Sequence, residues 1–80
     1  MFRTLIKTDA LVIDGRSFPV CYFEHRTLRG SRRYSADIIL APGDRIILDD
    51  DSMTNLEART MFLVPATLYS RMLARPATAA

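Results

Sequence analysis

The sequence contains almost no cysteine: Cys21 is the only one in 80 residues. A single thiol excludes an internal disulfide, and it also excludes a structural zinc site built from several cysteines. Stable disulfides belong to oxidising compartments, so a chain without them fits a reducing one. We therefore expect a cytoplasmic protein.

Long apolar runs are also missing, although 49% of the residues are hydrophobic. A membrane-spanning helix needs about 20 consecutive apolar residues, and no segment approaches that length. Lys7 and Asp9 interrupt the apolar N-terminal stretch before it reaches the length of a signal-peptide core. We expect neither a membrane partner nor a cleaved leader.

Catalytic side chains are scarce, since His25 is the only histidine. Cys21 lies four residues earlier, and on a strand this spacing separates the two side chains by about 13 Å. A thiol and an imidazole must be within hydrogen-bonding reach to act as nucleophile and base. Glu24 points to the opposite face, because neighbouring side chains on a strand alternate. We expect no enzyme activity, and with no cofactor-binding loop in the sequence we expect no cofactor.

Three consecutive aspartates, Asp49, Asp50 and Asp51, form the densest acidic segment. A calcium loop places its oxygen ligands at spaced positions around a glycine, and this run lacks that spacing. Acidic residues followed by Ser52 are typical of a helix start, where they cap free backbone amides and complement the helix dipole. The segment predicts a helix start and no metal site.

Turn signals organise the first half of the chain. Asp14-Gly15 separates two apolar runs and favours a two-residue hairpin turn, in which both residues adopt positive φ. The segment 27–31 contains a glycine and predicts a second turn. A third turn over 41–44 leads into a short strand over 45–48.

The registers of the two predicted hairpins agree, because both place apolar residues on the same face of the sheet. A turn centred on Asp14-Gly15 places the apolar residues of both its strands on one face. Pairing Arg26 with Arg32 across the second turn adds the apolar residues of the third strand, and a slip of one residue would scramble this surface. Pro19 cannot donate to a ladder, so it should mark an edge or a bulge. The apolar face consists of Leu11, Ile13, Phe18, Val20, Tyr22, Ala36, Ile38 and Leu40.

After the aspartates the hydrophobic pattern changes to helical spacing. Proline lacks an N–H and clashes with the preceding turn of a helix, so Pro65 should end or kink this one. A second short helix would then cover 66–73. The first helix has one apolar stripe, formed by Met53, Leu56, Thr60, Leu63 and Val64.

The predicted fold class is α+β, an antiparallel β-meander of about four strands followed by one or two C-terminal helices. Residues 1–74 form a single domain in this interpretation, and 75–80 form a frayed C-terminal tail. The segment 60–64 is ambiguous, because Met61 and Phe62 lie off the helical stripe. If it were a fifth strand, the chain would form a small SH3-like β-barrel with a terminal helix.

The C-terminal half has more apolar side chains than one face of a four-stranded sheet can cover. Monomers rarely expose apolar patches larger than a few hundred Å², and such patches tend to mark partner surfaces. The sequence therefore predicts a small non-catalytic protein-interaction module, as a homo-oligomer or with another protein partner. The predicted partner-binding residues are Phe62, Tyr69, Met72 and Leu73.

Lysine is nearly absent, and ten arginines stand against Lys7 in a chain of net charge +2. Four of them surround the second turn with no acid between them: Arg26, Arg29, Arg32 and Arg33. The arginine side chain forms a planar fork that suits phosphate, and β-ribbons enter nucleic-acid grooves. Phosphate or nucleic-acid binding through this hairpin tip is the alternative function, although a solvated loop would explain the same residues.

Overall fold

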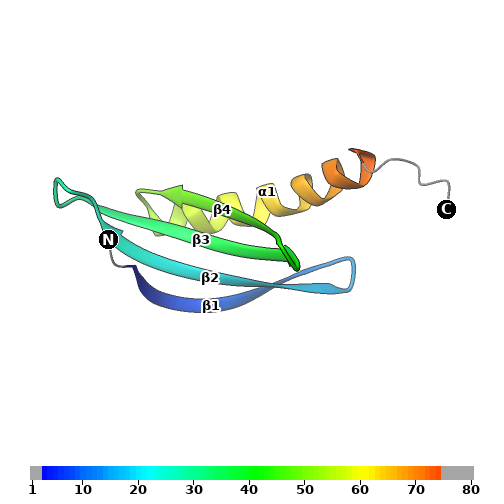
Figure 1. Ribbon diagram of the computed structural model, residues 1–80, viewed down its shortest axis with the longest axis horizontal. Coiled ribbons are helices and arrows are strands. Elements are labelled where there is room, and N and C mark those ends of the chain that lie inside the picture. Colours follow the sequence, from blue (N-terminus) through cyan, green and yellow to red (C-terminus); the bar gives the residue numbers. More distant parts are fainter. Residues whose placement is uncertain (1–2, 75–80) are drawn as a thin grey trace.

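The computed structural model describes the backbone of residues 3–74 and the side chains of residues 3–71. Four antiparallel strands form an open meander in the order β1-β2-β3-β4, and one helix follows. Figure 1 shows this helix lying along one side of the twisted sheet. The arrangement confirms the α+β class and excludes the barrel alternative. The elements are β1 (Thr4–Ile13), β2 (Arg16–Arg26), β3 (Arg32–Ala41), β4 (Asp44–Asp50) and α1 (Met53–Ala74).

Both predicted hairpin registers are confirmed. Asp14 and Gly15 have φ angles of 52° and 76°, as the two-residue turn requires. Across the second turn Arg26 pairs with Arg32, and the same register continues along β2 and β3. The apolar face that these registers create is the one that α1 covers.

The core lies between α1 and this face of the sheet. Thr60 is fully buried within it, and its hydroxyl donates a 2.8 Å hydrogen bond to the backbone oxygen of Leu56. Burial raises the pKa of the Tyr22 phenol in the same layer. The buried apolar residues are Phe18, Val20, Tyr22, Ala36, Ile38, Leu40, Leu56 and Val64.

Pro19 lies in β2, which is an inner strand of the sheet. It pairs with Ala10 of β1, whereas the pairing of β2 with β3 extends only as far as Val20. On its β3 side Pro19 therefore lies just past the end of the ladder. Pro19 therefore does not interrupt the pairing of β2 with β3, although β2 is an inner strand of the sheet.

The helix continues through Pro65, so Pro65 does not end it and 66–73 is not a separate helix; the one-helix form of the predicted fold is the one observed. Val64 is fully buried and Leu68 packs against the core, so both halves of the helix are held on the sheet. Pro65 itself is exposed on the solvent side of α1. The ambiguous segment 60–64 is helical, which leaves its off-stripe side chains pointing outward.

The start of α1 is held by Ser52, whose Oγ accepts a 3.2 Å hydrogen bond from the backbone N–H of Asn55. The Asp50 carboxylate accepts bonds from the Ser52 backbone N–H at 3.0 Å and from Arg59 at 3.0 Å. These two donors lower the pKa of Asp50, the Ser52 bond most. The predicted cap is confirmed for Ser52, whereas the aspartates precede the first turn of the helix.

We expect Asp50→Ala to lower the melting temperature at neutral pH and to lose this effect in acid. Because folding lowers the pKa of Asp50, its contribution is fully present above the ordinary value of 3.8 and disappears as the pH falls through the folded-state pKa. Thermal melts of both proteins between pH 7 and pH 2 measure this. A difference in melting temperature that persists unchanged at the acid end would contradict it.

Candidate interaction surface

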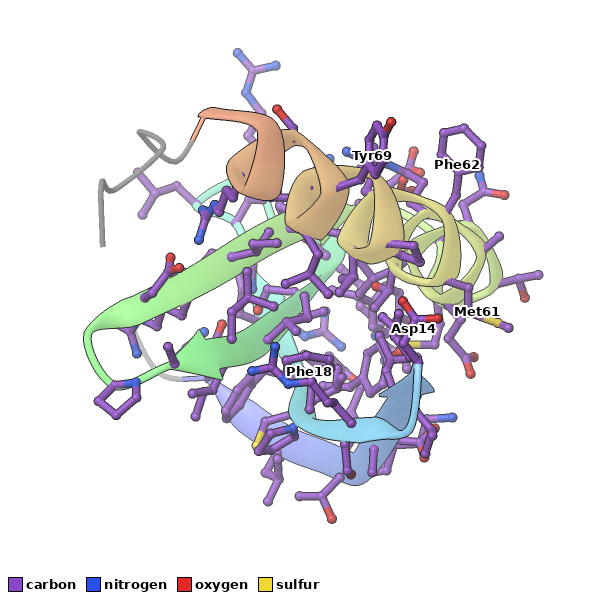
Figure 2. All side chains as sticks on the ribbon, turned by 90° about the vertical axis from the view of Figure 1, so that its right-hand side faces the viewer. Asp14, Phe18, Met61, Phe62 and Tyr69 are labelled. Atoms are coloured by element: carbon purple, nitrogen blue, oxygen red, sulfur yellow. The ribbon has the colours of Figure 1, made fainter. Side chains whose placement is uncertain are left out.

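The outward side of α1 carries large apolar side chains. Met61, Phe62 and Tyr69 are 67%, 75% and 63% exposed. Figure 2 shows Phe62 and Tyr69 pointing away from the sheet. Their spacing of seven residues puts them on the same side of the helix two turns apart. We define the outer patch as Ala58, Met61, Phe62, Pro65, Ala66 and Tyr69, all of which are exposed.

The charged residues beside the outer patch are bound to the sheet. Arg59 donates to the backbone oxygen of Asp49 at 2.8 Å and also reaches Asp50. Lys7 forms a 2.8 Å ion pair with Glu57, and this hydrogen bond raises the pKa of Lys7. Near the other end of the helix, Arg71 pairs with Asp44. The outer patch is therefore bordered by charges that are already neutralised within the chain.

A groove of about 410 Å³ lies under the C-terminal half of α1. Figure 2 shows Phe18 and Asp14 below the helix at this end of the molecule. Pro65 and Tyr69 belong both to the groove and to the outer patch, so the two surfaces are continuous. The other lining residues are Ile13, Asp14, Arg16, Phe18, Leu40, Ala41, Asp44, Leu68 and Arg71.

The predicted partner-binding residues are only partly covered by the structure. Phe62 and Tyr69 lie together on the outer patch, whereas the side chains of Met72 and Leu73 fall outside the described residues. Met61 and Pro65 were missing from the predicted set. The position of Met61 off the helical stripe is a signal for an outward side chain, whereas a proline expected to end or kink the helix gives no signal for a place on the outer patch.

The four arginines of the hairpin tip (residues 26–33) do not form one cluster. Arg26 and Arg32 pair directly across the turn and share one face of the sheet. Arg32 forms a 3.1 Å ion pair with Glu24, and Arg26 donates to the backbone oxygen of Gly30 at 3.3 Å. Arg33 points to the opposite face, because side chains alternate along a strand.

Arg33 pairs with His25 across the hairpin, and both line a shallow depression with Arg29. The Arg33 Nε donates a 2.9 Å hydrogen bond to Asp49 of β4. The structure thus brings together two of the four arginines, and it adds His25, a residue that the sequence offers only as a candidate for catalysis. The predicted register already separates Arg33 and His25 from Arg26 and Arg32, because side chains alternate between the two faces along a strand.

The residues considered for catalysis have other partners. Cys21 pairs with Asp37 in the sheet, as predicted. The Asp37 carboxylate accepts two hydrogen bonds from Arg3, at 3.3 and 3.4 Å, and is not directed at His25. The Arg3 guanidinium also lies 4.1 Å from the centre of the Phe23 ring. Among the described side chains, no group of three His, Cys, Asp or Glu residues is arranged to hold a metal ion.

Within residues 3–74, no helix combines the length and apolar character needed to cross a membrane. Comparison of the chain with protein-family models, with curated proteins and with solved structures gave no match. Its function must therefore be argued from its own surfaces: the outer patch, the groove and the hairpin tip.

Proposed function

We propose that this protein is a non-catalytic interaction module that self-associates through the outer patch. The observation that supports this is the apolar character of both sides of α1. Leu56 and Val64 are fully buried against the sheet, while Phe62 on the other side remains 75% exposed. In a surface helix the apolar side is usually the side that is buried, so a second apolar side left exposed indicates a partner.

The outer patch by itself is smaller than a standard interface. Large apolar side chains offer roughly 150–250 Å² each, so the three exposed ones together present on the order of 400 Å². Even the largest patch on a typical monomer is about 300–600 Å² and is often functional. A standard interface buries about 800 Å² per partner, so the patch supplies about half of it. The rest must come from the smaller neighbours on α1 and from the adjoining groove.

A second copy of the chain fits the patch without charge repulsion. In an antiparallel pair of helices with a twofold axis at Pro65, Met61 of one copy faces Tyr69 of the other. The same symmetry brings Arg59 towards Arg71 of the second copy. Each of these arginines already has an aspartate partner in its own chain, so the approach adds no unpaired like charge.

We expect the double variant Phe62→Lys/Tyr69→Lys to be monomeric at concentrations where the unaltered protein is a dimer. Each lysine would place an unpaired charge inside the interface, where its desolvation strongly opposes association. Sedimentation equilibrium over a range of protein concentrations measures the change. The monomer should keep its far-ultraviolet circular dichroism, since both side chains are exposed within one chain.

A matched control is Val12→Lys/Leu28→Lys, which alters two other exposed apolar residues, 71% and 97% exposed. This control should still form the dimer. If the unaltered protein stays a monodisperse monomer at high concentration, self-association is wrong. If instead the control dissociates and the Phe62/Tyr69 variant does not, a different surface makes the contact.

A further inference from the structure

We propose that the hairpin tip carries a second, independent site, which binds one phosphate group between Arg29 and Arg33 beside His25. These side chains line a shallow depression on the side of the tip opposite Arg26 and Arg32. The complete lining is His25, Thr27, Leu28, Arg29, Ser31 and Arg33, none of which is acidic.

The loop that forms the depression is held by hydrogen bonds. The backbone N–H of Thr27 donates to the Ser31 oxygen at 2.8 Å, and the Gly30 N–H donates to the Thr27 oxygen at 2.9 Å. The Thr27 hydroxyl oxygen accepts a third bond, from the Ser31 N–H at 3.1 Å. A ligand would therefore not have to order this segment, and that lowers the entropic cost of binding.

Arg33 and Arg29 both have N–H groups for an anion, but only Arg33 is held in place by an acidic residue within residues 3–71. Asp49 holds the Nε of Arg33, which fixes the guanidinium and leaves its terminal N–H groups for a ligand. Arg29 has no acidic partner among the described residues. Guanidinium groups bind phosphate oxygens through short charge-assisted hydrogen bonds. A dianionic phosphate offers enough acceptor oxygens for both arginines.

The His25 ring lies beside the two arginines in the depression, and one of its nitrogen atoms lacks a hydrogen-bond partner. Its Nδ1 is buried without a hydrogen-bond partner, the only such side-chain atom found in the described part of the chain. Buried polar atoms without partners are rare in folded proteins. The His25 ring lines the depression, but its Nδ1 is itself buried, so a bound anion would contact the two guanidinium groups and not this atom.

The phosphate group can come from a small monoester or from a nucleic-acid strand. The recognition chemistry is the same, but only a strand carries further phosphate groups that add contacts outside the depression. Three probes separate the sources: inorganic phosphate, a nucleoside monophosphate and a short single-stranded oligonucleotide.

The test is a nuclear magnetic resonance titration at low salt, which follows the His25 ring and the backbone amides of residues 27–31. We expect saturable shifts with inorganic phosphate. Arg29→Ala/Arg33→Ala should weaken binding at least about tenfold, since it removes two sets of charge-assisted hydrogen bonds. Arg26→Ala/Arg32→Ala removes the same charge from the other face and should change affinity less than about twofold. Equal losses in the two variants, or no saturable shift, would overturn the site.

Because Arg33→Ala also breaks the ion pair with Asp49, Arg29→Ala alone is the second variant. It should weaken phosphate binding severalfold and leave the melting temperature unchanged; unchanged binding would overturn the proposal.

An oligonucleotide that binds more tightly than the monophosphate and still depends on Arg29 and Arg33 identifies a strand as the source. An oligonucleotide that binds no more tightly identifies the small monoester, and one that depends equally on Arg26 and Arg32 rejects a defined site. Repeating the titration with the Phe62→Lys/Tyr69→Lys variant separates this result from self-association.

Discussion

Replacing Leu56 with alanine is expected to destabilise the fold by about 3 kcal/mol. Leu56 is fully buried where α1 meets the sheet, so truncation removes apolar contacts and leaves a cavity. Domains of this size have a small core, and total stabilities are only about 5–15 kcal/mol. The substitution would therefore remove a large part of the free energy of unfolding.

Urea denaturation of Leu56→Ala measures the loss as a lower midpoint with an unchanged slope. The experiment belongs in the Phe62→Lys/Tyr69→Lys background, because self-association would add a concentration-dependent contribution to stability. Leu28→Ala is the matched control: Leu28 is 97% exposed, and the same truncation there should stay within about 0.5 kcal/mol. If Leu56→Ala costs no more than Leu28→Ala, the packing of α1 on the sheet does not stabilise the fold.

Pro65→Ala is expected to stabilise the protein by about 2 kcal/mol. A proline in a helix interior costs about 3 kcal/mol relative to alanine, because it removes one hydrogen bond and crowds the preceding turn. Part of this cost, up to about 1 kcal/mol, is offset because proline also restricts the unfolded chain. Alanine would restore a backbone N–H able to donate to the Met61 oxygen. The melting temperature should rise by about 10 °C.

Pro42→Ala is the control for this prediction. Pro42 precedes Gly43, which has a φ of 77°, in the turn between β3 and β4. Proline followed by a glycine with positive φ is the preferred pattern of a type II turn. Its replacement should therefore lower stability, by up to about 1 kcal/mol. Because Pro65 belongs to the outer patch, the thermal melts are made in the Phe62→Lys/Tyr69→Lys background, where self-association does not contribute to stability. If Pro65→Ala gives no gain there, α1 already accommodates the proline without strain.

The strand pairing was predictable because its determinants are local. The backbone preference of Asp14-Gly15 and the alternation of apolar residues agree on one register, and the structure has that register. The helix start was predictable for the same reason, since Ser52 acts on amides three residues away. These signals need no knowledge of the rest of the molecule.

The helix does not end at Pro65, because there a local rule competes with packing between distant segments. Pro65 lacks an N–H in every context, but Val64 and Leu68 hold both halves of α1 on the sheet. The four arginines are close in sequence, but the pleat of the strands sends Arg33 to the opposite face. There it meets Asp49, sixteen residues away, a contact that no local pattern indicates.

The sequence by itself determined the turns, the register and the fact that α1 is apolar on two sides. Only the tertiary structure decided that α1 continues past Pro65 as one helix and which part of the chain covers its inward side. Burial of apolar surface is non-directional, so an apolar pattern does not select its own partner. The sheet and the capped connection from β4 place Leu56 and Val64 inward, and the same rotation of the helix leaves Phe62 and Tyr69 exposed.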